Sequence, residues 1–151
     1  MAFGDGNNDL EMFGAVGTAG QRCTTLRRLI AHESVKDEIV ERLKAAYSRV
    51  RIGHPLEGNL VGPLIDERSY LAMQDALARA REQGGRVFGG ERQLQERYPD
   101  AYYVSPAIVE MPGQTEVVRT ETFAPILYVV GYRDFDEALR LNNEVPQGLS
   151  S

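Results

Sequence analysis

An unbroken apolar run at residues 126–131, with the sequence ILYVVG, most constrains what this chain can fold into. A run without polar residues is typical of a strand buried on both faces of a sheet. Helical and strand-like patterns alternate along the rest of the chain. The sequence therefore predicts an α/β layer architecture in which this run forms a buried strand.

Three segments have the pattern of helices. Residues 35–50 carry apolar side chains along one face, and Ser34 before them is a good N-cap. Residues 67–83 show a similar stripe after the expected cap Asp66. A last helix is expected from Asp134 through Leu141. A weaker, glycine-containing helical pattern covers residues 9–20.

The remaining segments are predicted to be short strands and loops. Pro106 interrupts an apolar region and predicts a break between two strands. Three glycines and two prolines in IGHPLEGNLVGPLI predict an irregular loop at 52–65. A polar surface loop is expected at 91–100. The expected strands are 24–32, 87–88, 102–104 and 107–109.

Composition narrows the function classes. The chain has 151 residues, a size typical of one domain, and a formal net charge of -5, which argues against nucleic-acid binding. No apolar stretch is long enough to cross a bilayer, and the first residues do not form a secretory signal. The single cysteine excludes an internal disulfide and a multi-cysteine zinc site. These features favour a cytosolic protein.

That cysteine, Cys23, is the first candidate for chemistry. It follows a glycine-rich segment and precedes an expected strand, in the sequence GTAGQRCTT. A thiolate is a strong nucleophile, and the neighbouring Arg22 could stabilise it. The alternative is a buried structural cysteine, which is the commoner fate of a lone cysteine and is favoured by spacing alone.

A second candidate is the segment ETFAP at residues 121–125. The carboxylate of Glu121 could accept a hydrogen bond from a ribose hydroxyl, and Phe123 could pack against a flat ring. The alternative is an ordinary loop that leads into a strand. His32 and His54 have no partners at ligand spacing and are expected to be ordinary surface or strand-end histidines.

Four segments together carry a resemblance to a known family: FGAVGTAGQRCTT at 13–25, IGHPLEGNLVGPLI at 52–65, ETFAPILYV at 121–129 and NNEVPQGLSS at 142–151. The chain from about residue 13 resembles the catalytic domain of NAD-dependent aldehyde dehydrogenases, most of all the antiquitin branch, the α-aminoadipic semialdehyde dehydrogenases of lysine catabolism. The resemblance implies a three-layer α/β/α fold with a mostly parallel sheet.

The resemblance also implies residue roles. Cys23 would attack the aldehyde carbon, hydride would pass to NAD, and water would release the acid from the resulting thioester. The backbone N–H of Cys23 would help to stabilise the oxyanion. Glu121 would bind the nicotinamide ribose, and Phe123 would lie near the nicotinamide. Arg22 matches that branch's contact to a substrate carboxylate, which suits a guanidinium.

The chain departs from the family in what it contains. Residues 1–151 are expected to be one partial catalytic domain, with 1–13 a foreign or divergent lead-in. The family's cofactor-binding segment, its general-base glutamate and its oxyanion asparagine have no counterpart here. We therefore expect little or no dehydrogenase activity from the chain alone. Full-length relatives are oligomeric, and a non-catalytic α/β remnant with unpaired sheet edges would self-associate.

A shorter resemblance concerns the first residues. MAFGDGNNDLEMF resembles a motif of haloacid-dehalogenase-like phosphatases, in which Asp5 and Asp9 would help to hold Mg²⁺. The alternatives are a turn that caps the following helix, or a fusion scar. This reading predicts Mg²⁺-dependent phosphatase activity, but no nucleophile segment accompanies the motif. No metal is expected at the Cys23 site.

Overall fold

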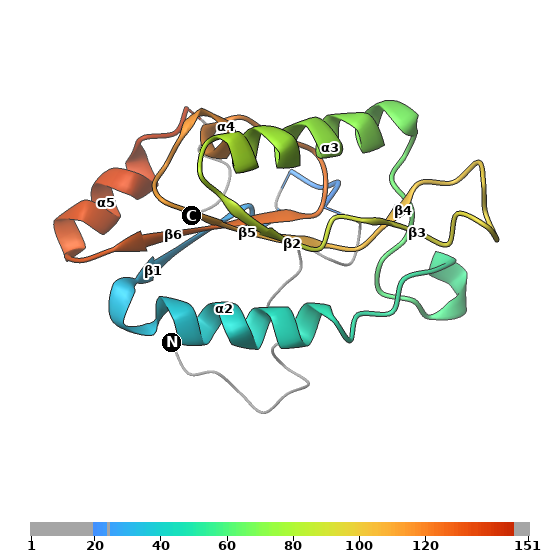
Figure 1. Ribbon diagram of the computed structural model, residues 1–151, viewed down its shortest axis with the longest axis horizontal. Helices are drawn as coiled ribbons and strands as arrows, with labels where there is room; N and C mark the ends of the chain where they lie inside the picture. Colours follow the sequence, from blue (N-terminus) through green and yellow to red (C-terminus); the bar gives the residue numbers. More distant parts are fainter. Residues whose placement is uncertain (1–19, 24, 147–151) are drawn as a thin grey trace.

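The computed structural model describes residues 20–23 and 25–146. A four-stranded sheet in the order β1-β6-β5-β2 forms its centre. Helices lie on both faces of this sheet (Figure 1). The expected α/β/α layering and mostly parallel sheet are therefore confirmed.

The sheet is parallel except at one edge. β1 (Arg28–His32) and β5 (Ala107–Met111) both pair in parallel with β6 (Ile126–Tyr132). β2 (Arg86–Phe88) pairs antiparallel with β5 and forms one edge. The first five residues of β6 are all buried, as their apolar run predicted.

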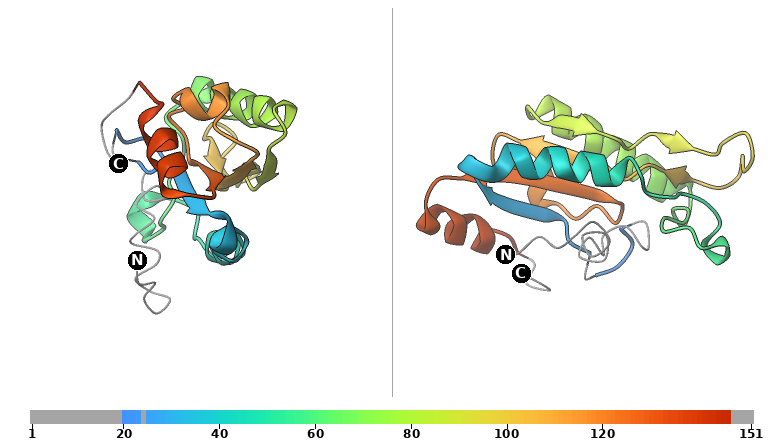
Figure 2. Two further views of the ribbon diagram at one scale, coloured as in Figure 1. Left: turned by 90° about the vertical axis from the view of Figure 1, so that its left-hand side faces the viewer. Right: turned by 90° about the horizontal axis from the view of Figure 1, so that it is seen from below.

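Three helices cover the two faces. α2 (Glu33–Tyr47) lies on one face, and α3 (Glu67–Glu82) and the short α4 (Glu116–Arg119) lie on the other (Figures 1 and 2). α5 (Phe135–Asn143) contacts β1 and β6. The expected helices at 67–83 and 134–141 are confirmed with their caps Asp66 and Asp134, which accept hydrogen bonds from backbone N–H groups three residues on. The sequence patterns did not predict α4.

The start of α2 differs from the expectation. The N-cap is His32 rather than Ser34, because Nδ1 of His32 accepts a hydrogen bond from the backbone N–H of Ser34 at 3.2 Å. The other ring nitrogen lies 3.0 Å from the carbonyl oxygen of Arg133. His32 is thus a strand-end residue with a partner for each ring nitrogen. This agrees with the expectation that it is an ordinary strand-end histidine.

The segment expected to be a polar loop at 91–100 contains a strand. β3 (Arg92–Gln93) pairs antiparallel with β4 (Tyr103–Val104) as a small separate hairpin. This strand could not be recognised from its polar sequence, because Arg92 packs over the ring of Tyr102 instead of contributing an apolar side chain. Its guanidinium carbon lies 4.6 Å from the ring centroid. The irregular loop at 52–65 is confirmed apart from one short 3-10 helix, η1 (Pro55–Glu57). The expected helix at 9–20 lies outside the described residues except for Gly20.

One charged side chain is buried in the sheet. Glu110 on β5 is only 8% exposed. Its two carboxylate oxygens accept hydrogen bonds from Nζ of Lys44 on α2 at 3.2 Å and from Nη2 of Arg86 on β2 at 2.7 Å. These contacts tie α2 and the edge strand to the centre of the sheet.

Candidate functional site

The segments that carry Cys23 and Glu121 each lead into a strand of the same parallel pair. Residues 20–27 precede β1, and residues 121–125 precede β6. Because β1 and β6 are parallel neighbours, their amino-terminal ends lie at the same edge of the sheet. The fold therefore brings two segments that are distant in sequence to one place.

Gly20 shows how closely these segments approach each other. Its backbone has a φ of +70°, and a β-carbon there would lie 2.3 Å from both the carbonyl carbon and the carbonyl oxygen of Ala124. It would also lie 2.5 Å from the nitrogen of Pro125. Only glycine fits this contact without a shift of backbone. The start of the Cys23 segment thus packs directly on the end of the ETFAP segment.

Gln21 fixes the same segment on another side. Its Nε2 donates to the carbonyl oxygen of Pro63 at 3.3 Å, and its Oε1 accepts from the backbone N–H of Ile65 at 2.9 Å. One side chain therefore uses both ends of its amide on the backbone of the 52–65 loop. These two hydrogen bonds hold the 52–65 loop next to the segment that carries Cys23.

Cys23 itself lies in a turn and is exposed as a free thiol. The turn is closed by a hydrogen bond from the backbone N–H of Thr25 to the carbonyl oxygen of Arg22 at 3.1 Å. The Arg22 side chain is also exposed. The structure thus contradicts the reading of a buried structural cysteine, and a reagent or substrate can reach the sulfur.

Glu121 and Phe123 are accessible on the neighbouring segment. The side chain of Glu121 is 46% exposed and lies 3.7 Å from Nη1 of Arg27. Phe123 is 47% exposed, whereas Ala124 and Pro125 after it are buried. An accessible carboxylate and an accessible ring therefore sit beside a backbone that is buried at Ala124 and Pro125.

Behind these groups lies Tyr128 on β6. Burial raises the pKa of its hydroxyl, and the positive charges of Arg79 and Arg27 act in the opposite direction. Its hydroxyl therefore stays protonated at neutral pH.

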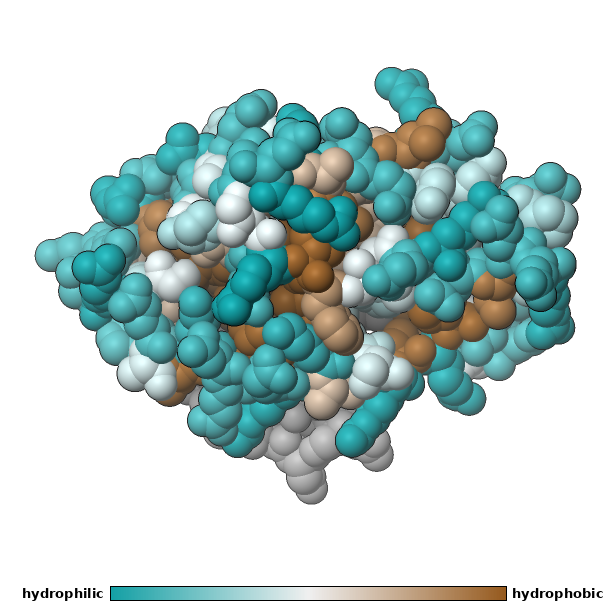
Figure 3. Space-filling model, in the orientation of Figure 1, coloured by the Kyte–Doolittle hydropathy of each residue, from teal (hydrophilic) through white to brown (hydrophobic). Residues whose placement is uncertain are grey.

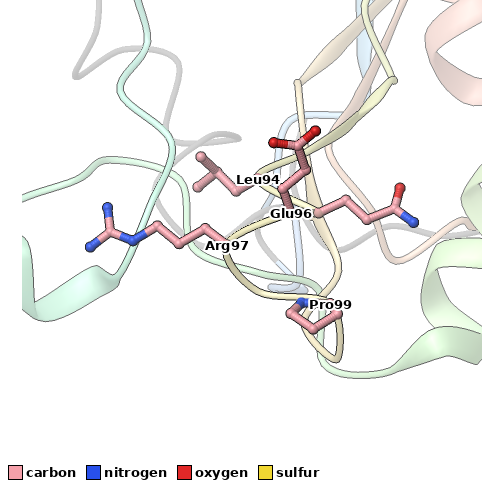
Figure 4. A pocket seen from close by; sticks show the side chains of 5 residues that line it. Leu94, Glu96, Arg97 and Pro99 are labelled. Carbon is pink, nitrogen blue, oxygen red and sulfur yellow. The ribbon is translucent and has the colours of Figure 1, made fainter.

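A separate hollow of about 780 Å³ lies at the loop of the β3–β4 hairpin. Figure 4 shows Glu96 and Arg97 pointing in different directions, so their charged groups do not converge on one ligand. The lining residues are Leu94, Gln95, Glu96, Arg97 and Pro99, none of which is a candidate site residue. In the part of the chain that the structure describes, no three His, Cys, Asp or Glu side chains gather to hold a metal ion. Asp5 and Asp9 lie outside that part.

Comparison with known proteins shows the family of this chain. The family model described as "Aldehyde dehydrogenase family" matches residues 8–151. The chain belongs to the aldehyde dehydrogenase family. The resemblance stated from the sequence motifs is thereby confirmed.

Relatives within this aldehyde dehydrogenase family include plant and animal proteins. The chain is 48% identical to "Aldehyde dehydrogenase family 7 member A1" of Pisum sativum over 92% of its own length and 27% of the relative's. It is 47% identical to "Alpha-aminoadipic semialdehyde dehydrogenase" of Bos taurus, over 93% of the chain and 26% of that protein. The chain thus spans about a quarter of the length of these relatives.

Solved structures of the family share the fold. The betaine aldehyde dehydrogenase of Staphylococcus aureus in complex with NAD+ superimposes with a TM-score of 0.84 at 23% identity, covering 91% of this chain and 28% of that one. At this identity the similarity supports the fold alone. No helix among the described residues is long and apolar enough to cross a membrane.

Two residues beside the site had no predicted role. Gln21 was visible in the motif GQRC, but a glutamine gives no sign of which backbone it will bind. Arg27 looked like an interruption of the expected strand at 24–32, whereas β1 begins only at Arg28. Arg27 and Arg28 stand side by side where the strand was expected to be apolar. This pair of arginines was the available sign that one of them has a polar partner on a neighbouring segment.

Proposed function

We propose that this chain supplies the nucleophile and part of the cofactor site of an NAD-dependent aldehyde dehydrogenase. The observation that carries the proposal is the contact of Gly20 with Ala124, which joins the Cys23 segment to the Glu121 segment. An exposed thiol beside an accessible carboxylate and aromatic ring suits oxidation of a small aldehyde by a nicotinamide cofactor. Residues 1–151 would form one part of the catalytic domain.

Cys23 is the proposed catalytic residue. Its thiolate adds to the aldehyde carbon and forms a carbon–sulfur bond, and the carbonyl oxygen becomes the oxyanion of a thiohemiacetal. The backbone N–H of Cys23 donates to that oxyanion. The oxyanion collapses to a thioester as hydride leaves. Water then hydrolyses the thioester, which releases the carboxylic acid and restores the thiol.

NAD, when bound, accepts the hydride at its nicotinamide ring. Glu121 is proposed to hold the nicotinamide ribose, because its carboxylate is open to solvent and can accept hydrogen bonds from hydroxyl groups. Phe123 is proposed to lie against the nicotinamide, since its ring is about half exposed beside Glu121. These two residues fix the cofactor relative to Cys23 through the backbone contact at Gly20.

Arg22 is proposed to select the substrate. The relative from Bos taurus is named for a semialdehyde that carries a carboxylate, and an exposed guanidinium next to the nucleophile can bind such a carboxylate with two hydrogen bonds. α-Aminoadipic semialdehyde is thus the proposed type of substrate. The single cysteine suits a reducing, cytosolic compartment.

The test uses a complete enzyme. Residues 8–151 replace the matched segment of the Pisum sativum relative, and folding of the hybrid is checked by circular dichroism and gel filtration. We expect NADH formation from aldehydes, and Cys23→Ser should lower kcat at least about 1000-fold. Arg22→Gln should raise KM for an aldehyde with a distal carboxylate more than for an uncharged aldehyde of equal length. A folded hybrid without activity, or full activity in Cys23→Ser, would overturn the proposal.

A further inference from the structure

We propose that Arg27 is a positioning residue that holds the carboxylate of Glu121 in place for the ribose. This inference rests on the proposed role of Glu121 in cofactor binding. Arg27 does not reach the reacting atoms in this scheme and acts only through Glu121. Three observations support it: the length of the ion pair, the rigid attachment of Arg27 and the separate pairing of the neighbouring cation.

The length of the ion pair leaves the carboxylate available. Nη1 of Arg27 lies 3.7 Å from Oε1 of Glu121, which is close enough for attraction but longer than a hydrogen bond. Among the described residues, none donates a hydrogen bond to Glu121. Both oxygens can therefore accept hydrogen bonds from a pair of ribose hydroxyls while the guanidinium keeps the group in place.

Arg27 is well fixed, whereas Glu121 is on an open segment. The backbone N–H of Tyr128 donates to the carbonyl oxygen of Arg27 at 2.8 Å, which ties Arg27 to β6 just before the β1–β6 ladder begins. The Arg27 side chain is only 19% exposed, against 46% for Glu121. A largely covered cation on a backbone held by β6 thus faces a more exposed anion, so Glu121 is the partner whose position depends more on the pair.

Arg27 also depends on Glu121 electrostatically. Its Nη1 is buried and has no hydrogen-bond partner among the residues that the structure describes. The other nearby cation, Arg79, is paired with Asp75 at 3.1 Å and Glu116 at 3.7 Å. Since a buried Nη1 without a hydrogen-bond acceptor is unfavourable, the nearby carboxylate of Glu121 compensates part of this cost.

A matched control is present at the opposite end of the same strands. Glu33 follows β1 and Arg133 follows β6, and Nε of Arg133 lies 3.3 Å from Oε1 of Glu33. This pair has the same two residue types just beyond the carboxyl ends of the same two strands, but both side chains are more than half exposed. A general effect of losing an arginine between β1 and β6 should therefore appear in Arg133→Gln as well.

The first test is a double-mutant cycle in the hybrid enzyme. We expect Glu121→Gln and Arg27→Gln each to raise KM for NAD about tenfold, with kcat changed less than about twofold. The double variant should be no worse than Glu121→Gln, because Arg27 acts through that carboxylate. Arg27→Lys should recover part of the loss, and Arg133→Gln should leave KM for NAD unchanged.

The second test uses this chain as it is. Hydrogen–deuterium exchange should be faster at residues 121–124 in Arg27→Gln, while β1 and β6 keep their protection. If Arg27→Gln does not fold, Glu121→Gln removes the same ion pair from the other side and should speed exchange at 121–124 in the same way.

The outcomes separate the two proposals. If Glu121→Gln leaves KM for NAD unchanged, the proposed role of Glu121 fails. If Glu121→Gln raises it but Arg27→Gln does not, or if the two effects multiply, the role of Arg27 is overturned. Unchanged exchange at 121–124 would overturn it as well.

Discussion

Gly20 and Ala124 touch backbone to backbone, although nearly the whole described chain separates them in sequence. We expect Gly20→Ala to destabilise the protein by at least about 2 kcal/mol, because the new β-carbon meets a carbonyl and the backbone is left-handed. Gly58→Ala is the control, since Gly58 has a φ of +71° and nothing within 4 Å. Urea denaturation of both variants separates the cost of the left-handed backbone from the cost of the contact with Ala124. Equal losses would mean that the contact itself contributes nothing.

Glu110 should be important for stability. Glu110→Ala removes the partner of Lys44 and Arg86, and we expect a loss of about 2 kcal/mol because the carboxylate is buried between two cations. Glu41→Ala removes an exposed partner of the same lysine and should cost less than about 0.5 kcal/mol. Thermal unfolding followed by circular dichroism measures both. A smaller loss for Glu110→Ala than for Glu41→Ala would contradict this interpretation.

Acid should weaken the start of α3. The hydrogen bond from the backbone N–H of Ser69 lowers the pKa of Asp66 below its ordinary value. The stabilisation is therefore complete above the pKa of the unfolded chain, about 3.9, and is lost as the pH falls through the lower folded value. Asp66→Asn keeps an N-cap acceptor but removes this titration. Melting temperatures of both proteins should converge at low pH, and parallel curves would refute the prediction.

The edge of the sheet at β2 should promote association. Figure 3 shows an apolar area on the face between α2 and α3, where β2 lies in Figure 1. Phe88 on this strand is 37% exposed, and no described strand pairs with its outer edge. We expect dimers or larger species at high concentration, and Phe88→Lys should reduce them. Analytical ultracentrifugation tests this, with Phe135→Lys as a control on α5, where the phenylalanine is more exposed.

Much of the fold could be predicted because its signals are local. The apolar run of β6, the caps Asp66 and Asp134 and the break at Pro106 each depend on neighbouring residues. The hairpin strand at Arg92 could not be found, since the apolar partner of that arginine is a tyrosine ring ten residues away. The start of α2 was misplaced because a histidine took the role expected of a serine.

The candidate site divides in the same way. Cys23, Arg22, Glu121 and Phe123 came from motifs, and the structure adds that all four are exposed. Arg27 and Gln21 could not be predicted, because their partners Glu121, Pro63 and Ile65 are distant in sequence and are chosen by the sheet and the 52–65 loop. Local sequence thus identifies chemical groups, whereas tertiary contacts decide which of them work together.

The parallel pairing of β1 with β6 has a consequence for how such proteins can vary. The register of β1 against β6 sets where Cys23 lies relative to Glu121, and the length of the chain between them does not. Insertions or deletions in the hairpin loop at 94–102 would therefore leave that relation intact. A single residue added within β1 or β6 would instead shift one segment past the other by one residue and turn its side chains to the opposite face of the sheet. Natural length variation should accumulate in the connections and be absent from these two strands.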